Sequence, residues 1–329
     1  MNHVEITVDG KAQKMGNNFH AIRYVLAALV LYSHAYGLLA LPEPGVFQFS
    51  FGSFAVKCFF ALSGYLITLS CVRSTHLWHY ILNRVLRIAP ALIIALLLSH
   101  WVGSFFGNFI QNPTPYILNG PVWTLSWEIV CYGLCGLLWW SGLLTKNSMG
   151  PIVAISWLIF IFLPQTGDTI AVIAPLILLF FTGSLLALDE KQFSIRIAGP
   201  LFLMLLIGMS IDTNTIGLTW FFNQIPFLYG PNLPSHKYYL FAFVFGLPFA
   251  LIWLALYVKP IINLRNDYSY GLYIYGWPVQ QAIIALFTPS PLLLFVSSLA
   301  VTHCLSMFSW HLVESGRSCL SVEFTVNIA

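Results

Sequence analysis

Long apolar runs alternate with short polar segments along the whole chain, and the first apolar run begins after a polar stretch at 1–18. Runs of about 20 apolar residues are long enough to cross a bilayer as helices, and a helix satisfies its own backbone hydrogen bonds in lipid. The pattern predicts ten spans, at 19–40, 51–71, 88–106, 122–143, 150–164, 170–188, 197–212, 238–257, 269–288 and 291–312. The segment 213–237 leaves room for a re-entrant turn.

The composition strengthens this interpretation. The 329 residues include 14 Lys and Arg and 11 Asp and Glu, which makes 8% charged residues, against about 25% in an average soluble domain. The mean hydropathy is +0.81. These values exclude a soluble globular enzyme, a disordered chain and a nucleic-acid-binding protein. We expect an all-α polytopic transmembrane helical bundle in contact with membrane lipids. The six cysteines are expected to pack in apolar surroundings rather than to form disulfides or a metal site.

The distribution of positive charge predicts the orientation of the bundle. With ten spans, all Lys and Arg residues except Lys57 and Lys237 fall on the side of the N-terminus. Since short cytoplasmic loops carry an excess of Lys and Arg, both termini are expected to be cytoplasmic. The sequence shows no signal peptide pattern. The predicted organisation is a polar tail at 1–18, a transmembrane domain at 19–315 and a short tail at 316–329.

His34 is the first ionisable residue placed deep in a predicted span. Such residues are costly in lipid and are functional candidates. Arg23 precedes His34 by eleven residues, so the two share one helix face about 16 Å apart. A histidine at this depth can act as a general base or acid. The structural alternative is a helix-packing histidine bonded to a neighbouring carbonyl group.

Glu128 is the acidic counterpart, just inside the fourth predicted span. A carboxylate inside a membrane needs a partner or a proton. A pair of Glu128 with His34 would orient the imidazole and stabilise its charged form, as in a catalytic dyad. The alternative is a structural ion pair between Glu128 and Lys57.

Arg84 and Arg87 stand three residues apart at the start of the third predicted span and therefore project to one side. Guanidinium groups bind phosphates through paired hydrogen bonds. The alternative is that these arginines serve only as topology signals or contact anionic lipids.

Five segments occur in order along the chain. They are Arg23 with His34, KCFFALSGYLIT in the second span, NRVLRIAP at the third, VWTLSWEIVCY at the fourth and DYSYGLYIYGWPVQQ in the ninth. Together they resemble the acyltransferase family 3 membrane proteins, and the resemblance covers nearly the whole chain. Two segments depart from the family pattern. Residues 276–278 are Gly-Trp-Pro where many members have His-Trp-Pro, and residues 314–316 are Glu-Ser-Gly in place of Glu-x-Pro.

The resemblance implies acyl transfer from cytoplasmic acyl-CoA, most often acetyl-CoA, to a sugar hydroxyl of a cell-surface or lipid-linked carbohydrate, in a bacterial inner membrane. Acetyl-CoA would act as a co-substrate, and no permanently bound cofactor is expected. Arg23, Arg84 and Arg87 would hold its phosphates. His34 would act as the general base, and Glu128 would orient the imidazole or position the sugar.

Three other functions fit parts of the pattern. A secondary transporter or flippase would also have about ten helices and a few buried ionisable groups, but it would typically show repeat symmetry. A non-catalytic lipid- or glycan-binding subunit would not need both His34 and the cytoplasmic arginines. The other large class of membrane acyltransferases would be expected to carry an Asn/His pair further along the chain.

Overall fold

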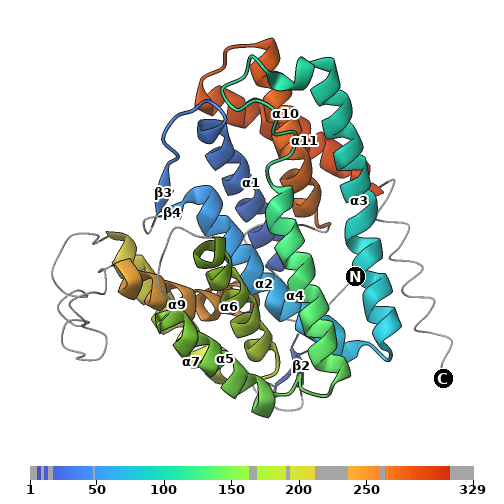
Figure 1. Ribbon diagram of the computed structural model, residues 1–329. Coiled ribbons are helices and arrows are strands. Elements are labelled where there is room, and N and C mark those ends of the chain that lie inside the picture. Colours follow the sequence, from blue (N-terminus) through green and yellow to red (C-terminus); the bar gives the residue numbers. More distant parts are fainter. Residues whose placement is uncertain are drawn as a thin grey trace.

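The computed structural model describes residues 6–8, 11–13, 18–46, 49–162, 169–189, 193–211, 236–259, 264 and 266–311. Ten α-helices lie in these parts of the chain (Figure 1). They are α1 (Phe19–Gly37), α2 (Phe51–Arg73), α3 (Leu77–Phe105), α4 (Val122–Trp140), α5 (Lys146–Phe162), α6 (Thr169–Ala187), α7 (Phe193–Ile211), α9 (His236–Tyr257), α10 (Ser269–Leu286) and α11 (Pro291–Ser309). One 3₁₀ turn, η1 (Gly107–Phe109), follows α3.

Each predicted span coincides with one of these helices. The largest difference is at α3, which begins at Leu77 and not at the predicted residue 88. The apolar run starts near residue 88, but the helix extends backward through a mixed polar and apolar segment and carries Pro90 in its interior. Arg84 and Arg87 therefore lie inside this helix, beyond its first turn. Most of the predicted re-entrant segment, residues 213–235, lies outside the described residues.

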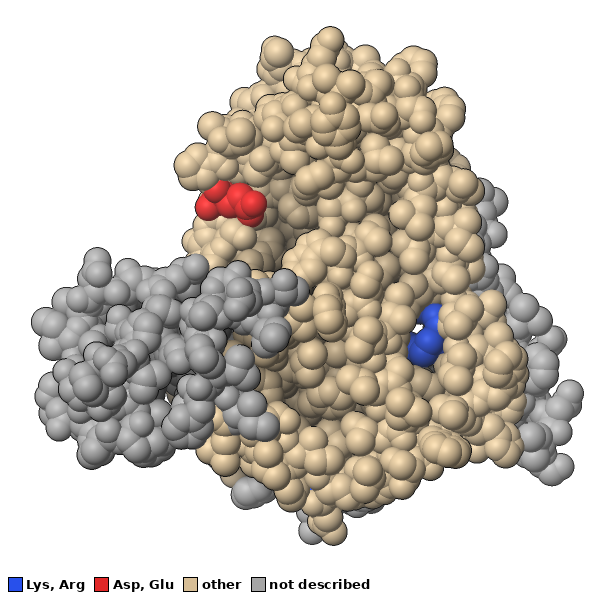
Figure 2. Space-filling model, in the orientation of Figure 1, with Lys and Arg blue, Asp and Glu red and all other residues tan. Residues whose placement is uncertain are grey.

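Four helices are both long and apolar enough to cross a membrane, namely α2, α3, α4 and α11. Residues such as Leu97, Trp101 and Phe105 on α3 are more than half exposed, as expected of side chains that face lipid. Figure 2 shows one face of the molecule on which almost all described residues are uncharged. The chain therefore has the character of an integral membrane protein.

Helices α1 and α2 form the centre of the bundle, with α6 and α9 against α2, and α10 and α11 against α1 (Figure 1). Glycine allows the close contact between α2 and α6. A Cβ atom on Gly64 would lie 1.8 Å from the carbonyl oxygen of Phe180, and one on Gly183 would lie 2.2 Å from that of Ala61. Small residues at such positions are how membrane helices bring their backbones together.

Local signals fix the starts of two helices. The Ser50 hydroxyl accepts a hydrogen bond from the Ser53 amide at the start of α2. Ser290 accepts one from the Leu293 amide at α11, where Pro291 occupies the first turn. These are N-cap arrangements that satisfy amides left free at a helix start.

Two short hairpins accompany the helices of this mostly helical fold. Strands β1 (Ile6–Val8) and β2 (Lys11–Gln13) pair antiparallel in the N-terminal segment. The sequence between them is Asp-Gly, a dipeptide typical of tight hairpins. Strands β3 (Gly45–Val46) and β4 (Phe49–Ser50) form a second short hairpin before α2.

Candidate active site

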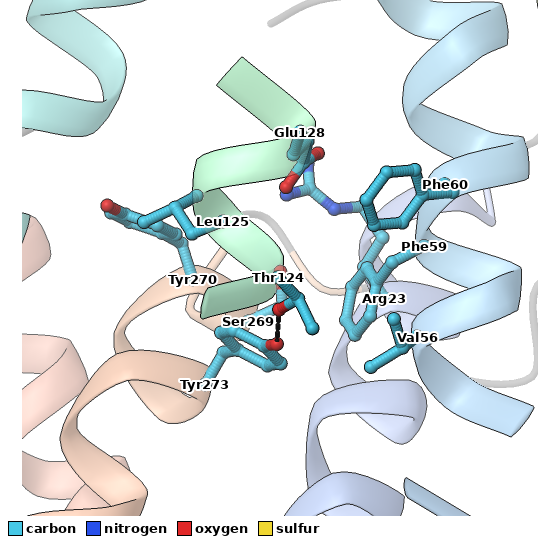
Figure 3. Close-up of a pocket in the computed structure, with 10 residues that line it drawn as sticks. All are labelled: Arg23, Val56, Phe59, Phe60, Thr124, Leu125, Glu128, Ser269, Tyr270 and Tyr273. Carbon is cyan, nitrogen blue, oxygen red and sulfur yellow. Dashed lines mark hydrogen bonds between the residues drawn. The ribbon is translucent and has the colours of Figure 1, made fainter. Parts of the chain in front are cut away.

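A cavity lies among α1, α2, α4 and the start of α10. Its lining is apolar on the α2 side and mostly polar elsewhere. It is made by Arg23, Val56, Phe59, Phe60, Thr124, Leu125, Glu128, Ser269, Tyr270 and Tyr273. The Thr124 and Tyr273 hydroxyls hydrogen-bond to each other across it (Figure 3). Apolar walls with a few convergent polar groups are typical of a small-molecule site.

Glu128 is held in this cavity by two hydroxyl groups. Ser63 of α2 donates to Oε1 of Glu128, and Tyr132, one turn further along α4, donates to the same oxygen at 2.7 Å. Glu128 of α4 and Arg23 of α1 both line this cavity (Figure 3). The alternative ion pair with Lys57 is not found among the described interactions. The Lys57 ammonium instead donates to Ser53 and lies over the Phe49 ring.

A buried carboxylate joins two of the predicted arginines. Oδ2 of Asp267 lies 2.8 Å from Nη1 of Arg23 and 2.5 Å from Nη2 of Arg87. Oδ1 of Asp267 accepts hydrogen bonds from the amide and hydroxyl of Ser269. Asp267 is 3% exposed, so one carboxylate links α1, α3 and the start of α10.

The electrostatics of this group follow from its burial and its partners. Burial alone would raise the pKa of the Asp267 carboxyl, but the Arg23 and Arg87 guanidiniums outweigh burial and hold the pKa below its ordinary value. The carboxylate is therefore ionised at neutral pH. Two guanidiniums share one negative charge, which leaves the group with a net positive charge available to an anion.

Arg84 differs from the other two predicted arginines. Its Nη2 donates to the Ser70 hydroxyl at 3.3 Å, and its buried Nε has no hydrogen-bond partner among the described residues. Because an unsatisfied buried donor is costly, this guanidinium retains capacity for an additional acceptor. The structure therefore brings Arg23 and Arg87 together at Asp267, while Arg84 lies one helical turn from Arg87 on α3.

His34 lies on α1, three turns from Arg23, as the spacing predicts. Its half-buried ring packs edge-on against Trp277 of α10, with ring centroids 4.9 Å apart and an interplanar angle of 82°. Among the described residues no hydrogen bond or ion pair joins His34 to Glu128, and the pairing of these two residues stays a prediction. Trp277 is one turn beyond Tyr273 on α10, so His34 lies one helical turn beyond the end of the cavity lining.

Asp267 is the main site residue that the sequence interpretation did not predict, because it lies just before the predicted span 269–288 and not inside it. A signal was present. Only 11 acidic residues occur in the chain, and one of them, Asp267, is the first residue of the segment DYSYGLYIYGWPVQQ. Within the described residues no group of three or more His, Cys, Asp or Glu is arranged to hold a metal ion.

An apolar helical bundle with an internal cavity that combines guanidinium, carboxylate and hydroxyl groups, one turn from an imidazole, fits a membrane-embedded enzyme. Residues 17–311 match the family described as an acyltransferase domain. The chain belongs to this family, acyltransferase family 3, and is an acyltransferase.

Two relatives align along almost their whole length. The chain is 30% identical to an O-acetyl transferase of Shigella phage Sf6, over 91% of this chain and 95% of the relative. It is 26% identical to nodulation protein 10 of Rhizobium leguminosarum bv. viciae, over 91% of this chain and 92% of that protein. No solved structure matches the chain significantly.

Proposed function

We propose that the protein transfers an acetyl group from cytoplasmic acetyl-CoA to a hydroxyl of a cell-surface or lipid-linked carbohydrate. The proposal includes a bacterial inner membrane, about ten crossings and cytoplasmic termini. The family supports acyl transfer, and the name of the phage relative supports acetyl as the group transferred. The charge asymmetry of the loops supports the orientation.

The observation that carries the proposal is the arrangement along α1. Arg23 lines the cavity from one end, beside Asp267 and Arg87, and His34 stands three turns away beyond the other end. Coenzyme A carries several phosphates, which suit a cluster with net positive charge. Arg84, with its unsatisfied Nε, supplies a further donor. The acyl-pantetheine arm would then lie in the cavity and point its thioester toward His34.

The chemistry at the thioester is acyl transfer to oxygen. The imidazole of His34 takes the proton from the hydroxyl of the sugar while the oxygen of that hydroxyl attacks the thioester carbonyl carbon. The carbon–sulfur bond breaks, and coenzyme A leaves as a thiolate that takes up a proton. Glu128, fixed by Ser63 and Tyr132, positions the sugar or stabilises positive charge on the imidazole.

The experiment measures transfer of labelled acetyl from acetyl-CoA to membrane carbohydrate, using membranes that contain wild-type protein or His34→Ala. We expect loss of transfer with normal membrane insertion. Full activity of the variant would contradict the role of His34.

The donor site is tested separately by acetyl-CoA binding to Arg84→Ala/Arg87→Ala. We expect weaker binding of acetyl-CoA. Unchanged affinity would mean that these arginines serve only as topology signals. Solute flux equal with and without acetyl-CoA, and no acetyl transfer, would favour the transporter or flippase.

A further inference from the structure

Trp277 of α10 is held from two sides by the segment that connects η1 to α4. Its indole N–H donates to the carbonyl oxygen of Ile117 at 2.8 Å. Gly120 lies against its ring, so closely that a Cβ at that position would be 2.7 Å from a ring carbon. The indole is therefore both hydrogen-bonded and confined.

The connecting segment is itself fixed to α10 by further hydrogen bonds. The Asn112 amide donates to the carbonyl and side-chain oxygens of Gln281 at 3.0 and 2.6 Å. Gln281 in turn donates to the carbonyl of Thr114 at 2.8 Å. Asn119 donates to the carbonyl of Ile274 at 2.9 Å. Since these bonds lie on both sides of Ile117, the carbonyl that receives the indole proton has a fixed position.

The indole also contacts His34. The rings meet edge-on at 4.9 Å, and among the described residues no hydrogen bond to the His34 imidazole is present. Gln280, on the same helix as Trp277, is fully buried and donates to the carbonyl of Leu31, one turn before His34. Helix α10 therefore contacts the turn that carries His34 in two ways, through the hydrogen bond from the Gln280 side chain and through the Trp277 ring.

We propose that Trp277 is a positioning residue. Its indole, confined by Ile117 and Gly120, fixes the orientation of the His34 imidazole for proton acceptance. Trp277 does not itself take part in bond making, and it acts on the reaction only through His34. This inference rests on the proposed function of His34 as the general base.

The test is a double-mutant cycle with Gly120→Ala and Trp277→Ala, measuring kcat for acetyl transfer and KM for acetyl-CoA. We expect Trp277→Ala to lower kcat about 100-fold, because misplacing a catalytic group by about an ångström has an effect of this size. Gly120→Ala, whose added methyl displaces the indole, is expected to lower kcat about tenfold by the same route. KM for acetyl-CoA should change less than about twofold in both, since the loss lies in the transition state.

The combination of the two substitutions gives the sharper result. With the indole removed, the methyl at residue 120 has nothing to displace, so the double variant should match Trp277→Ala alone. Residues that act through one contact are non-additive in this way. Additive losses, or a raised KM with unchanged kcat, would overturn the proposal.

Two further variants control for folding. Gly133→Ala is the matched control, because a Cβ there meets nothing within 4 Å, and its kcat should equal that of the wild type. Trp277→Phe keeps a ring beside His34 without the indole N–H, and its kcat should lie above that of Trp277→Ala. A phenylalanine variant no better than alanine would contradict positioning by ring contact.

The outcomes also separate this inference from the proposed function. If His34→Ala is inactive while Trp277→Ala keeps wild-type kcat, only the role of Trp277 fails. If His34→Ala remains active, the proposed function fails whatever the result at Trp277.

Discussion

Asp267→Asn removes the negative charge that two guanidiniums share while keeping the size of the side chain. Asn can still accept the hydrogen bonds from Ser269, but it leaves Arg23 and Arg87 close together and uncompensated. Breaking a buried pair by removing one partner costs about 3–5 kcal/mol. The arginine side chains are 23% and 29% exposed, so partial hydration favours the lower end, about 3 kcal/mol.

Asp189→Asn is the matched control, since Asp189 is also a buried aspartate outside the helices. Its basic partner, Lys146, has a 61% exposed side chain, and exposed ion pairs contribute about 0–1 kcal/mol. Asn can also keep a hydrogen bond from Ser194 at this position. We expect Asp189→Asn to cost clearly less than Asp267→Asn.

The assay is unfolding of purified protein in mixed detergent micelles, followed by the fluorescence of the 11 tryptophans, at a series of pH values. Because the folded-state pKa of Asp267 is lowered by its arginines, its stabilisation is complete above the unfolded pKa of about 4. It is lost as the pH falls through the lower folded-state value. The difference in the free energy of unfolding between wild type and Asp267→Asn should therefore be constant from about pH 8 to 5 and should become smaller below about pH 4.

Equal losses of stability for the two aspartate substitutions would refute the reasoning, because they would mean that the contact of Asp267 with two arginines adds nothing to the stability of the protein. A difference that disappears near neutral pH would refute it as well, since it would require the pKa of Asp267 to be raised.

Two further predictions concern packing and the carboxylate in the cavity. Gly64→Ala should destabilise the protein by more than about 2 kcal/mol, because its Cβ would meet the Phe180 carbonyl oxygen at 1.8 Å. The same unfolding assay compares Gly64→Ala with the control Gly133→Ala, and equal stability of the two variants would contradict the prediction. Ser63→Ala and Tyr132→Phe should each cost about 1.5–3 kcal/mol, as expected for a hydrogen bond to a charged group. Since both hydroxyls donate to one oxygen of Glu128, the two costs should be non-additive in a double-mutant cycle, and simple additivity would argue against a shared acceptor.

The positions of the helices could be predicted from the sequence because lipid permits few backbone conformations. A run of about 20 apolar residues must be helical to satisfy its amides, and the ten predicted spans therefore coincide with ten helices. The start of α3 was missed by eleven residues because its first three turns are not a purely apolar run. There the helix begins at Leu77 and passes through Arg84 and Arg87 before Pro90.

The candidate site was less predictable, because sequence gives the depth of a residue in a span but not which neighbouring helix it faces. The sequence interpretation paired His34 with Glu128. In the structure His34 contacts Trp277 of α10, whereas Glu128 contacts Ser63 of α2 and Tyr132 of its own helix. The arginines were expected from motif spacing, but their shared carboxylate depends on α1, α3 and α10 meeting at Asp267, which no local pattern encodes.

The most direct test of the central claim is to measure donor binding and acetyl transfer in the same preparation of His34→Gln. Glutamine keeps a polar side chain of similar length but cannot act as a base near neutral pH. We predict acetyl-CoA affinity within about twofold of wild type and a fall in transfer of at least about 100-fold, as expected for loss of a general base. Wild-type transfer by a normally inserted His34→Gln protein would contradict the account.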